Sequence, residues 1–123
     1  MYKNLAENCD MVLLEKKTIS AIGLARRAGK LVIGAEMCEE AVRAGKAVLC
    51  VMASDLSENT SKKLHDCLKY RNVPYIKLSI GKGELAKILG KSAVTVSCVI
   101  TDKDFASIIY KALETNENNS TQM

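Results

Sequence analysis

The amino-acid sequence predicts an α/β protein in which helices cover both faces of a sheet. Segments with helical periodicity alternate with short apolar segments, giving five helices and four strands in strict alternation. The segment 47–53, "AVLCVMA", is an unbroken apolar run, which is typical of a strand buried on both faces. Glycines and a single proline separate the segments, so each element has a clear end.

The first helix is predicted over 15–30, "EKKTISAIGLARRAGK", where Ile19, Ile22 and Ala25 recur at helical spacing. Arginines lie in its last turn, where cations oppose the helix dipole, and Gly29 is placed as a left-handed C-terminal stop. The short segment "LVIG" that follows is predicted to be a strand.

The second helix is predicted over 36–45, "EMCEEAVRAG", and ends at Gly45. Its acidic residues lie in the first turns, where carboxylates suit the positive end of a helix. Helical spacing predicts a buried stripe that includes Met37, Cys38, Ala41 and Val42.

The third helix, over 56–72, is predicted to open with a capping box formed by Asp55 and Glu58. Its inward-facing residues are predicted to be Leu64, Cys67 and Leu68.

The remaining elements are shorter. Pro74 precedes a predicted strand "YIKLS", and a short helix "GELAKIL" is expected to bury Leu85, Ile88 and Leu89 and to stop at Gly90. Another strand is predicted over 93–100.

The last helix is predicted to be capped by Thr101 with Asp104. Its buried stripe is expected to contain four residues: Phe105, Ile108, Ile109 and Ala112.

We therefore predict one domain over 15–113. Residues 1–14 form an N-terminal extension that we expect to be ordered in part. The tail 114–123, "ETNENNSTQM", has nothing to bury and is predicted to be disordered.

Composition indicates a cytoplasmic protein without a membrane span. The 123 residues are 48% hydrophobic, yet no apolar run reaches the roughly 18 residues that a span requires. The five cysteines are widely spaced, no Cys-x-x-Cys occurs, and His65 is the single histidine, so the ligand spacing of a zinc site is absent. We expect reduced, structural thiols, and no metal or cofactor.

Positive charge is segregated along the chain. Residues 16–30 carry five Lys or Arg and no acid, and residues 60–91 carry eight against two acids. This distribution favours a polyanion partner. Because only 4% of the residues are aromatic, stacking of single-stranded bases is disfavoured, and a shaped RNA fits better; no DNA is expected.

The stretch 81–92, "GKGELAKILGKS", ends like a nucleotide-binding Walker loop but lacks its other requirements. The pattern needs glycine where this chain has Leu85, a predicted core residue. A helix ends at Gly90 and a strand follows, whereas a phosphate loop leads into a helix. No catalytic pair accompanies His65, so we predict no enzyme activity and no catalytic residue.

Lysines and glycine turns instead suggest a binding edge. Lys30, the 34–36 turn, the 81–83 turn and the 90–93 turn all join predicted elements. Glycine turns let backbone N–H groups approach a phosphate, and the lysines neutralise it. Periodicity does not show whether these turns share an edge.

Several stretches between about Ile19 and about Leu113 occur in a characteristic order: "GLARRAGKLVIGAE", "AVRAGKAVLCVMASDLSENTSKKL", "YRNVPYIKL", "GELAKILGK" and "VTVSCVITDKDFA". Together they resemble the bacterial branch of the ribosomal protein L-seven-Ae/L-thirty-e superfamily. The resemblance implies a three-layer α-β-α sandwich with a four-stranded mixed sheet. It also implies kink-turn RNA binding, in which the protein grips a bent duplex around tandem sheared G·A pairs in ribosomal or other structured RNA.

By position, the superfamily motif Gly-x-Asn-Glu-x-x-Lys falls on residues 34–40. Gly34 matches, while Glu36 stands in place of Asn, Met37 in place of Glu and Glu40 in place of Lys. The bacterial branch often has Gly-x-Glu here, so the resemblance implies that Glu36 accepts from guanine.

The resemblance and the turns together predict a structured-RNA-binding protein that is ribosomal or ribosome-associated. The expected RNA-binding residues are Lys30, Gly34, Ala35, Glu36, Met37, Glu40, Arg43, Lys82, Lys91, Ser92 and Ala93. The alternative is a protein-interaction module on the same fold, with an RNA surface weakened by Met37 and Glu40.

Overall fold

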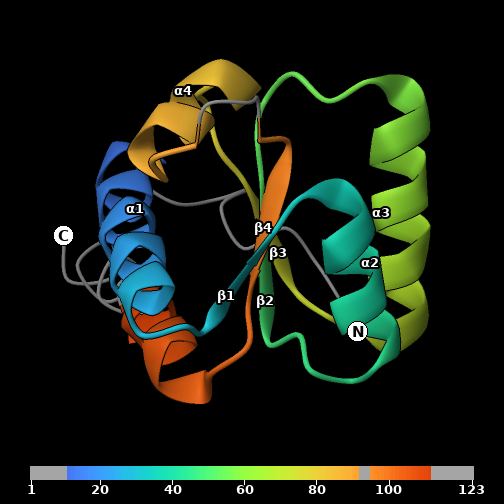
Figure 1. Cartoon of the computed structure of the whole chain (residues 1–123), viewed down its shortest axis with the longest axis horizontal. Helices are drawn as coiled ribbons and strands as arrows, with labels where there is room; N and C mark the ends of the chain where they lie inside the picture. The colour runs from blue at the N-terminus through green and yellow to red at the C-terminus, as the bar shows by residue number, and fades with distance from the viewer. Residues whose placement is uncertain (1–10, 92–94, 112–123) are drawn as a thin grey trace, which may run out of the picture.

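The computed structural model describes residues 11–91 and 95–111 and places them in three layers (Figure 1). The described elements, in chain order, are α1 (Met11–Arg27), β1 (Leu31–Ile33), α2 (Ala35–Arg43), β2 (Leu49–Met52), α3 (Glu58–Arg71), β3 (Tyr75–Lys77), α4 (Lys82–Ile88), β4 (Ser97–Ile100) and a helix over 103–111. The predicted three-layer α-β-α sandwich is confirmed. The tail predicted at 114–123 lies outside the described residues.

The sheet is mixed, with the strand order β1-β4-β2-β3. The last strand in the chain, β4, runs antiparallel to both of its neighbours, and its Ile100 is opposite Leu31 of β1 and Leu49 of β2. The edge strand β3 runs parallel to β2. As a result β1, β2 and β3 all start at one end of the sheet and finish at the other.

Alternation along the two central strands builds a core on each face. Leu49 and Val51 of β2 face α1, α4 and the helix over 103–111, whereas Cys50 and Met52 face α2 and α3 (Figure 1). All four of these residues are completely buried. The unbroken apolar run at 47–53 is thereby explained, because both faces of β2 are covered by helices.

Leu85 is also completely buried, as predicted for the short helix "GELAKIL". Two other predictions about burial are wrong. The Met37 side chain is 54% exposed and the Ile88 side chain is 39% exposed. Each lies on the outer side of its helix, because other residues of the same helix form the buried inner side.

Both predicted capping arrangements are wrong by one or two positions. Ser57, not Asp55, caps α3, and its hydroxyl accepts a hydrogen bond from the Thr60 N–H at 3.2 Å. At the last helix Asp102 replaces the predicted Thr101, since its carboxylate accepts from the N–H of Asp104 at 2.7 Å.

The carboxylate of Asp55 instead joins two distant loops. Its Oδ1 accepts a hydrogen bond from the Lys82 N–H at 2.8 Å, at the start of α4. A Cβ added at Gly81 would lie 2.9 Å from Asp55 Oδ2, so a side chain at this position would push the carboxylate aside.

We predict that Gly81→Ala lowers the free energy of unfolding by about 1 kcal/mol, because the new methyl group displaces the carboxylate from the Lys82 N–H. The matched control is Gly83→Ala, where nothing lies within 4 Å of the added Cβ. There the helix gains about 0.5–1 kcal/mol from the loss of a helical glycine. Urea unfolding measures both changes.

A double-mutant cycle isolates the contact. In an Asp55→Ala background, Gly81→Ala should cost less, since the clash and the hydrogen bond are both gone and only the N-cap preference for glycine over alanine remains. An equal cost in both backgrounds would contradict the assignment.

Candidate nucleic-acid interface

Two turns far apart in the sequence meet where β4 begins. The Gly34 N–H donates to the Ser97 carbonyl at 3.0 Å, and the Thr95 N–H donates to the Lys82 carbonyl at 3.1 Å. At the start of β4, the 34–37 turn is therefore hydrogen-bonded to Ser97 and the 81–83 turn is hydrogen-bonded to Thr95. We call this the Gly34 end, in the upper part of Figure 1.

Gly34 shapes the start of α2. Its φ of 106° and ψ of 146° lie in a region that favours glycine, and its carbonyl accepts the first helical hydrogen bond from Cys38 N at 2.9 Å. Among the described residues, no side chain caps the helix start. The N–H groups of its first turn, with the positive end of the helix dipole, thus suit an acceptor or an anion.

The outer face of α2 carries three of the sequence-predicted site residues. Glu36, Met37 and Glu40 are exposed, and Ala35 opens the helix beside them. On the inner side of the same helix, Cys38 is completely buried. The predicted base-contacting turn is consequently open to solvent, with two carboxylates on it.

Lys82 is half-buried at the first position of α4, where Asp55 holds its backbone. Lys91 is exposed just after α4, beyond the left-handed Gly90. Its N–H donates to the Ala86 carbonyl at 2.8 Å. The predicted site residues Ser92 and Ala93 lie outside the described residues.

Two predicted contacts are not at the Gly34 end. Lys30 precedes β1, and its carbonyl accepts from the Thr101 N–H at 3.0 Å, so it lies where β4 ends. Arg43 is the last residue of α2, and with a rise of about 1.5 Å per residue it lies about 12 Å along the axis from Ala35. The structure groups both with the opposite end of the sheet.

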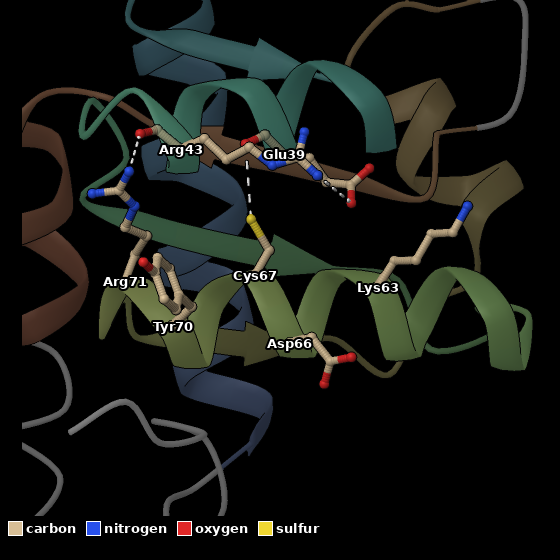
Figure 2. Close-up of a pocket in the computed structure, with 7 residues that line it drawn as sticks. All are labelled: Glu39, Arg43, Lys63, Asp66, Cys67, Tyr70 and Arg71. Atoms are coloured by element: carbon tan, nitrogen blue, oxygen red, sulfur yellow. Dashed lines mark hydrogen bonds and ion pairs between the residues drawn. The ribbon is translucent and has the colours of Figure 1, made fainter.

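A shallow groove of about 500 Å³ between α2 and α3 is a feature that the sequence did not reveal (Figure 2). Its lining residues are Glu39, Arg43, Lys63, Asp66, Cys67, Tyr70 and Arg71. The lining residues that belong to α3 recur at helical spacing. This pattern in the sequence could have indicated that they share one face of the helix. Tyr70 is 82% exposed there.

Contacts across the groove join the two helices (Figure 2). The guanidinium of Arg71 donates to the Arg43 carbonyl at 2.7 Å, and the Cys67 thiol donates to the Glu39 carbonyl at 3.8 Å. Arg43 also pairs with Glu39 at 3.6 Å, a surface ion pair of little energetic weight.

The four described cysteines are free thiols with reduced reactivity. Burial raises the pKa of Cys38 to about 11, although the hydrogen bond from Ser97 opposes this. Burial also raises the pKa of the half-buried Cys67, against the opposing charge of Arg43. Thiols with raised pKa values are protonated at neutral pH and are weak nucleophiles.

The described ranges 11–91 and 95–111 contain no cluster of three side chains suited to hold a metal ion. No helix within them is both long and apolar enough to cross a membrane. His65 is half-buried, with Nδ1 at 3.1 Å from the Ser61 hydroxyl and its ring edge-on to Tyr75.

Comparisons with known proteins agree with this geometry. Residues 16–110 match the model of the "Ribosomal protein L7Ae/L30e/S12e/Gadd45 family". The chain is similar to proteins named "RNA-binding protein YlxQ" from two bacteria. Identity is 36% over 99 residues in Enterococcus faecium and 37% over 93 residues in Bacillus subtilis. These matches cover 80% and 76% of this chain, and 93% and 91% of the relatives.

Solved structures share the fold. A protein of unknown function from Bacillus halodurans superimposes with a TM-score of 0.70 at 28% identity, covering 79% of this chain and 96% of that one. The Giardia lamblia 15.5kD RNA binding protein also gives a TM-score of 0.70, at 20% identity, covering 94% of this chain and 98% of that one.

We predict that Gly34→Ala lowers the free energy of unfolding by about 1–3 kcal/mol, the cost of holding a side-chain-bearing residue in so sparsely populated a conformation. Space is not the cause, since nothing lies within 4 Å of the added Cβ. Gly23→Ala is the matched control in α1, where the surroundings are equally open and the helix gains about 0.5–1 kcal/mol. If urea unfolding finds the two variants equally stable, the backbone assignment at Gly34 fails.

Proposed function

Because this chain belongs to the ribosomal protein L7Ae/L30e/S12e/Gadd45 family, we propose that it binds structured RNA of the kink-turn type at its Gly34 end. The relatives named for RNA binding support an RNA partner.

One observation carries the proposal: the exposed, uncapped start of α2 and the Lys82 turn are bonded to the same short segment, through Ser97 and Thr95. The 34–37 turn offers backbone N–H groups and the Glu36 carboxylate to base edges. Lys82 and Lys91 offer positive charge to phosphates. Such an arrangement suits a bent duplex that presents base edges and backbone together.

We propose no catalytic role for this protein. Its described thiols are protonated at neutral pH and its described histidine is held by Ser61 and Tyr75. We propose a ribosomal or ribosome-associated, non-enzymatic function in the cytoplasm, where thiols such as Cys38 and Cys50 stay reduced.

The described surface also sets a limit on affinity at this end. Glu40 is exposed on the same face of α2 as Glu36, and a carboxylate beside a phosphate is repulsive. Met37 is exposed and has no strong donor or acceptor to offer a guanine edge. The alternative of a protein-interaction module rests on these same residues.

We predict that a kink-turn RNA binds more tightly than a matched RNA whose tandem G·A pairs are replaced by Watson–Crick pairs. The bend that these pairs allow is what brings base edges to the 34–37 turn while phosphates reach Lys82. Fluorescence anisotropy titrations at several salt concentrations measure the difference. Equal affinity for the two RNAs would contradict kink-turn recognition.

Substituting the superfamily residues at positions 37 and 40 tests whether Met37 and Glu40 weaken RNA binding. We predict that Met37→Glu combined with Glu40→Lys raises kink-turn affinity about tenfold, because one change adds an acceptor for guanine and the other adds a phosphate contact. Both positions are exposed, so folding should be unaffected. Unchanged affinity would favour the protein-interaction alternative over RNA binding at this face.

A further inference from the structure

Two helix ends in this chain have the same six-residue pattern, Ala-x-Arg-Ala-Gly-Lys. It occurs at 25–30 as "ARRAGK" and at 41–46 as "AVRAGK". The first copy ends α1 and the second ends α2, on opposite faces of the sheet (Figure 1). We call these two copies the AGK corners.

The AGK corners also share their backbone geometry. Gly29 and Gly45 both have positive φ, at 73° and 75°. In each corner the lysine N–H donates back across the last turn: Lys30 N to the Ala25 carbonyl at 2.8 Å, and Lys46 N to the Ala41 carbonyl at 3.0 Å. This is the Schellman arrangement, and it leaves both lysine side chains exposed just beyond a helix.

The sheet brings the AGK corners together. The strands that follow them, β1 and β2, flank β4, so that Leu31 and Leu49 both lie opposite Ile100. Two strand spacings separate them, about 10 Å. Both lysines therefore lie at the end of the sheet opposite the Gly34 end, which we call the Lys30 end, in the lower part of Figure 1.

Further cations lie at the Lys30 end. The helix α3 finishes there, and its Arg71 donates to the Arg43 carbonyl at 2.7 Å, which fixes one guanidinium against the second AGK corner (Figure 2). The described cations of this end include Arg27, Lys30, Arg43, Lys46, Lys69, Arg71 and Lys103, and its described carboxylates include Asp102, Asp104 and Glu39, which pairs with Arg43.

Charges at the Gly34 end are arranged differently. The described carboxylates there include Glu36, Asp55 and Glu58, and the described cations include Lys63 beside Glu36, Lys77 at the end of β3, Lys82 and Lys91. Cations exceed carboxylates by less there than at the Lys30 end, so a polyanion is attracted more strongly to the Lys30 end.

Helix dipoles explain only part of this basic charge. Cations in a last turn oppose the negative helix end, and Arg27 and Arg43 are accounted for in that way. Lys30 and Lys46 lie beyond the turn, where the corner N–H groups already satisfy the carbonyls of Ala25 and Ala41. Within residues 11–91 and 95–111 their side chains form no ion pair, which leaves them able to contact an external anion.

We propose that the Lys30 end is a second RNA-binding surface, which contacts the phosphate backbone of a duplex segment without reading its sequence. It takes a different part of the RNA from the Gly34 end, so that one protein molecule bridges two RNA segments. Duplex binding at the Lys30 end does not depend on the proposed function. Only the bridging of two RNA segments rests on the proposed function.

The test uses Lys30→Gln with Lys46→Gln, which keeps the backbone of both corners. The matched control is Lys17→Gln with Lys62→Gln, which removes the same charge from exposed positions on α1 and α3. The probes are a fully paired RNA duplex of about 20 base pairs, longer than the roughly 16 that a duplex-binding domain spans, and a short-armed kink-turn RNA. Anisotropy is measured over a range of salt concentrations.

We expect wild-type protein and the control variant to bind the duplex alike. The corner variant should bind it about tenfold more weakly at low salt, with the slope of log K against log salt reduced by about 2, since each lost phosphate contact removes about 0.9. Affinity for the short kink-turn RNA should not change. Equal weakening by the corner and control variants, or no duplex binding by the wild type, would overturn the proposal.

A capture assay separates the two surfaces. Immobilised kink-turn RNA should retain labelled duplex only when wild-type protein is present, and the corner variant should abolish retention. If kink-turn RNA is bound no better than its G·A-replaced partner, the proposed function fails while the anisotropy result for the Lys30 end stands. If the corner variant still bridges the two RNAs, the second surface is overturned.

Discussion

The pairing of β4 between β1 and β2 determines where every surface of this protein lies. Because β4 runs antiparallel to both neighbours, it gives β1 and β2 the same direction and leaves their ends in line. The segment entering β4 bonds to Gly34 and Lys82, and the segment leaving it bonds to Lys30 and Val48. One four-residue strand thus organises both ends of the molecule, although its own side chains are completely buried.

Burial on both faces is the reason this strand has no exposed chemistry of its own. Cys98 and Ile100 pack toward α1, and Val99 packs toward α2 and α3. Three of the four residues of β4 are apolar and the fourth, Ser97, is buried, so function is left to the turns at its two ends. The buried strand and the functional turns are separate because backbone N–H groups and lysines are exposed where the helices no longer cover the sheet.

Local patterns in the sequence predicted the elements, and non-local contacts account for what they missed. Helical periodicity and glycine stops placed α2 and α4, and Leu85 was identified as a core residue. Asp55 was misread as a cap because its partner, the Lys82 N–H, is distant in the chain, whereas Ser57 satisfies the local requirement. The proximity of Gly34 to Lys82 likewise depends on strand order, which periodicity does not encode. The sequence therefore supplied residues for the candidate site but not their grouping.

The late position of β4 in the chain has a consequence for synthesis on the ribosome. Until residues up to about Ile100 have left the ribosome, β4 is not available to pair with β1 and β2. The parallel pair of β2 and β3 can already form at that point. Long-range pairing of this kind is slow to form and comes after local helix formation. Before β4 pairs, the turns at Gly34 and Lys82 and the AGK corners are therefore not held in their final arrangement.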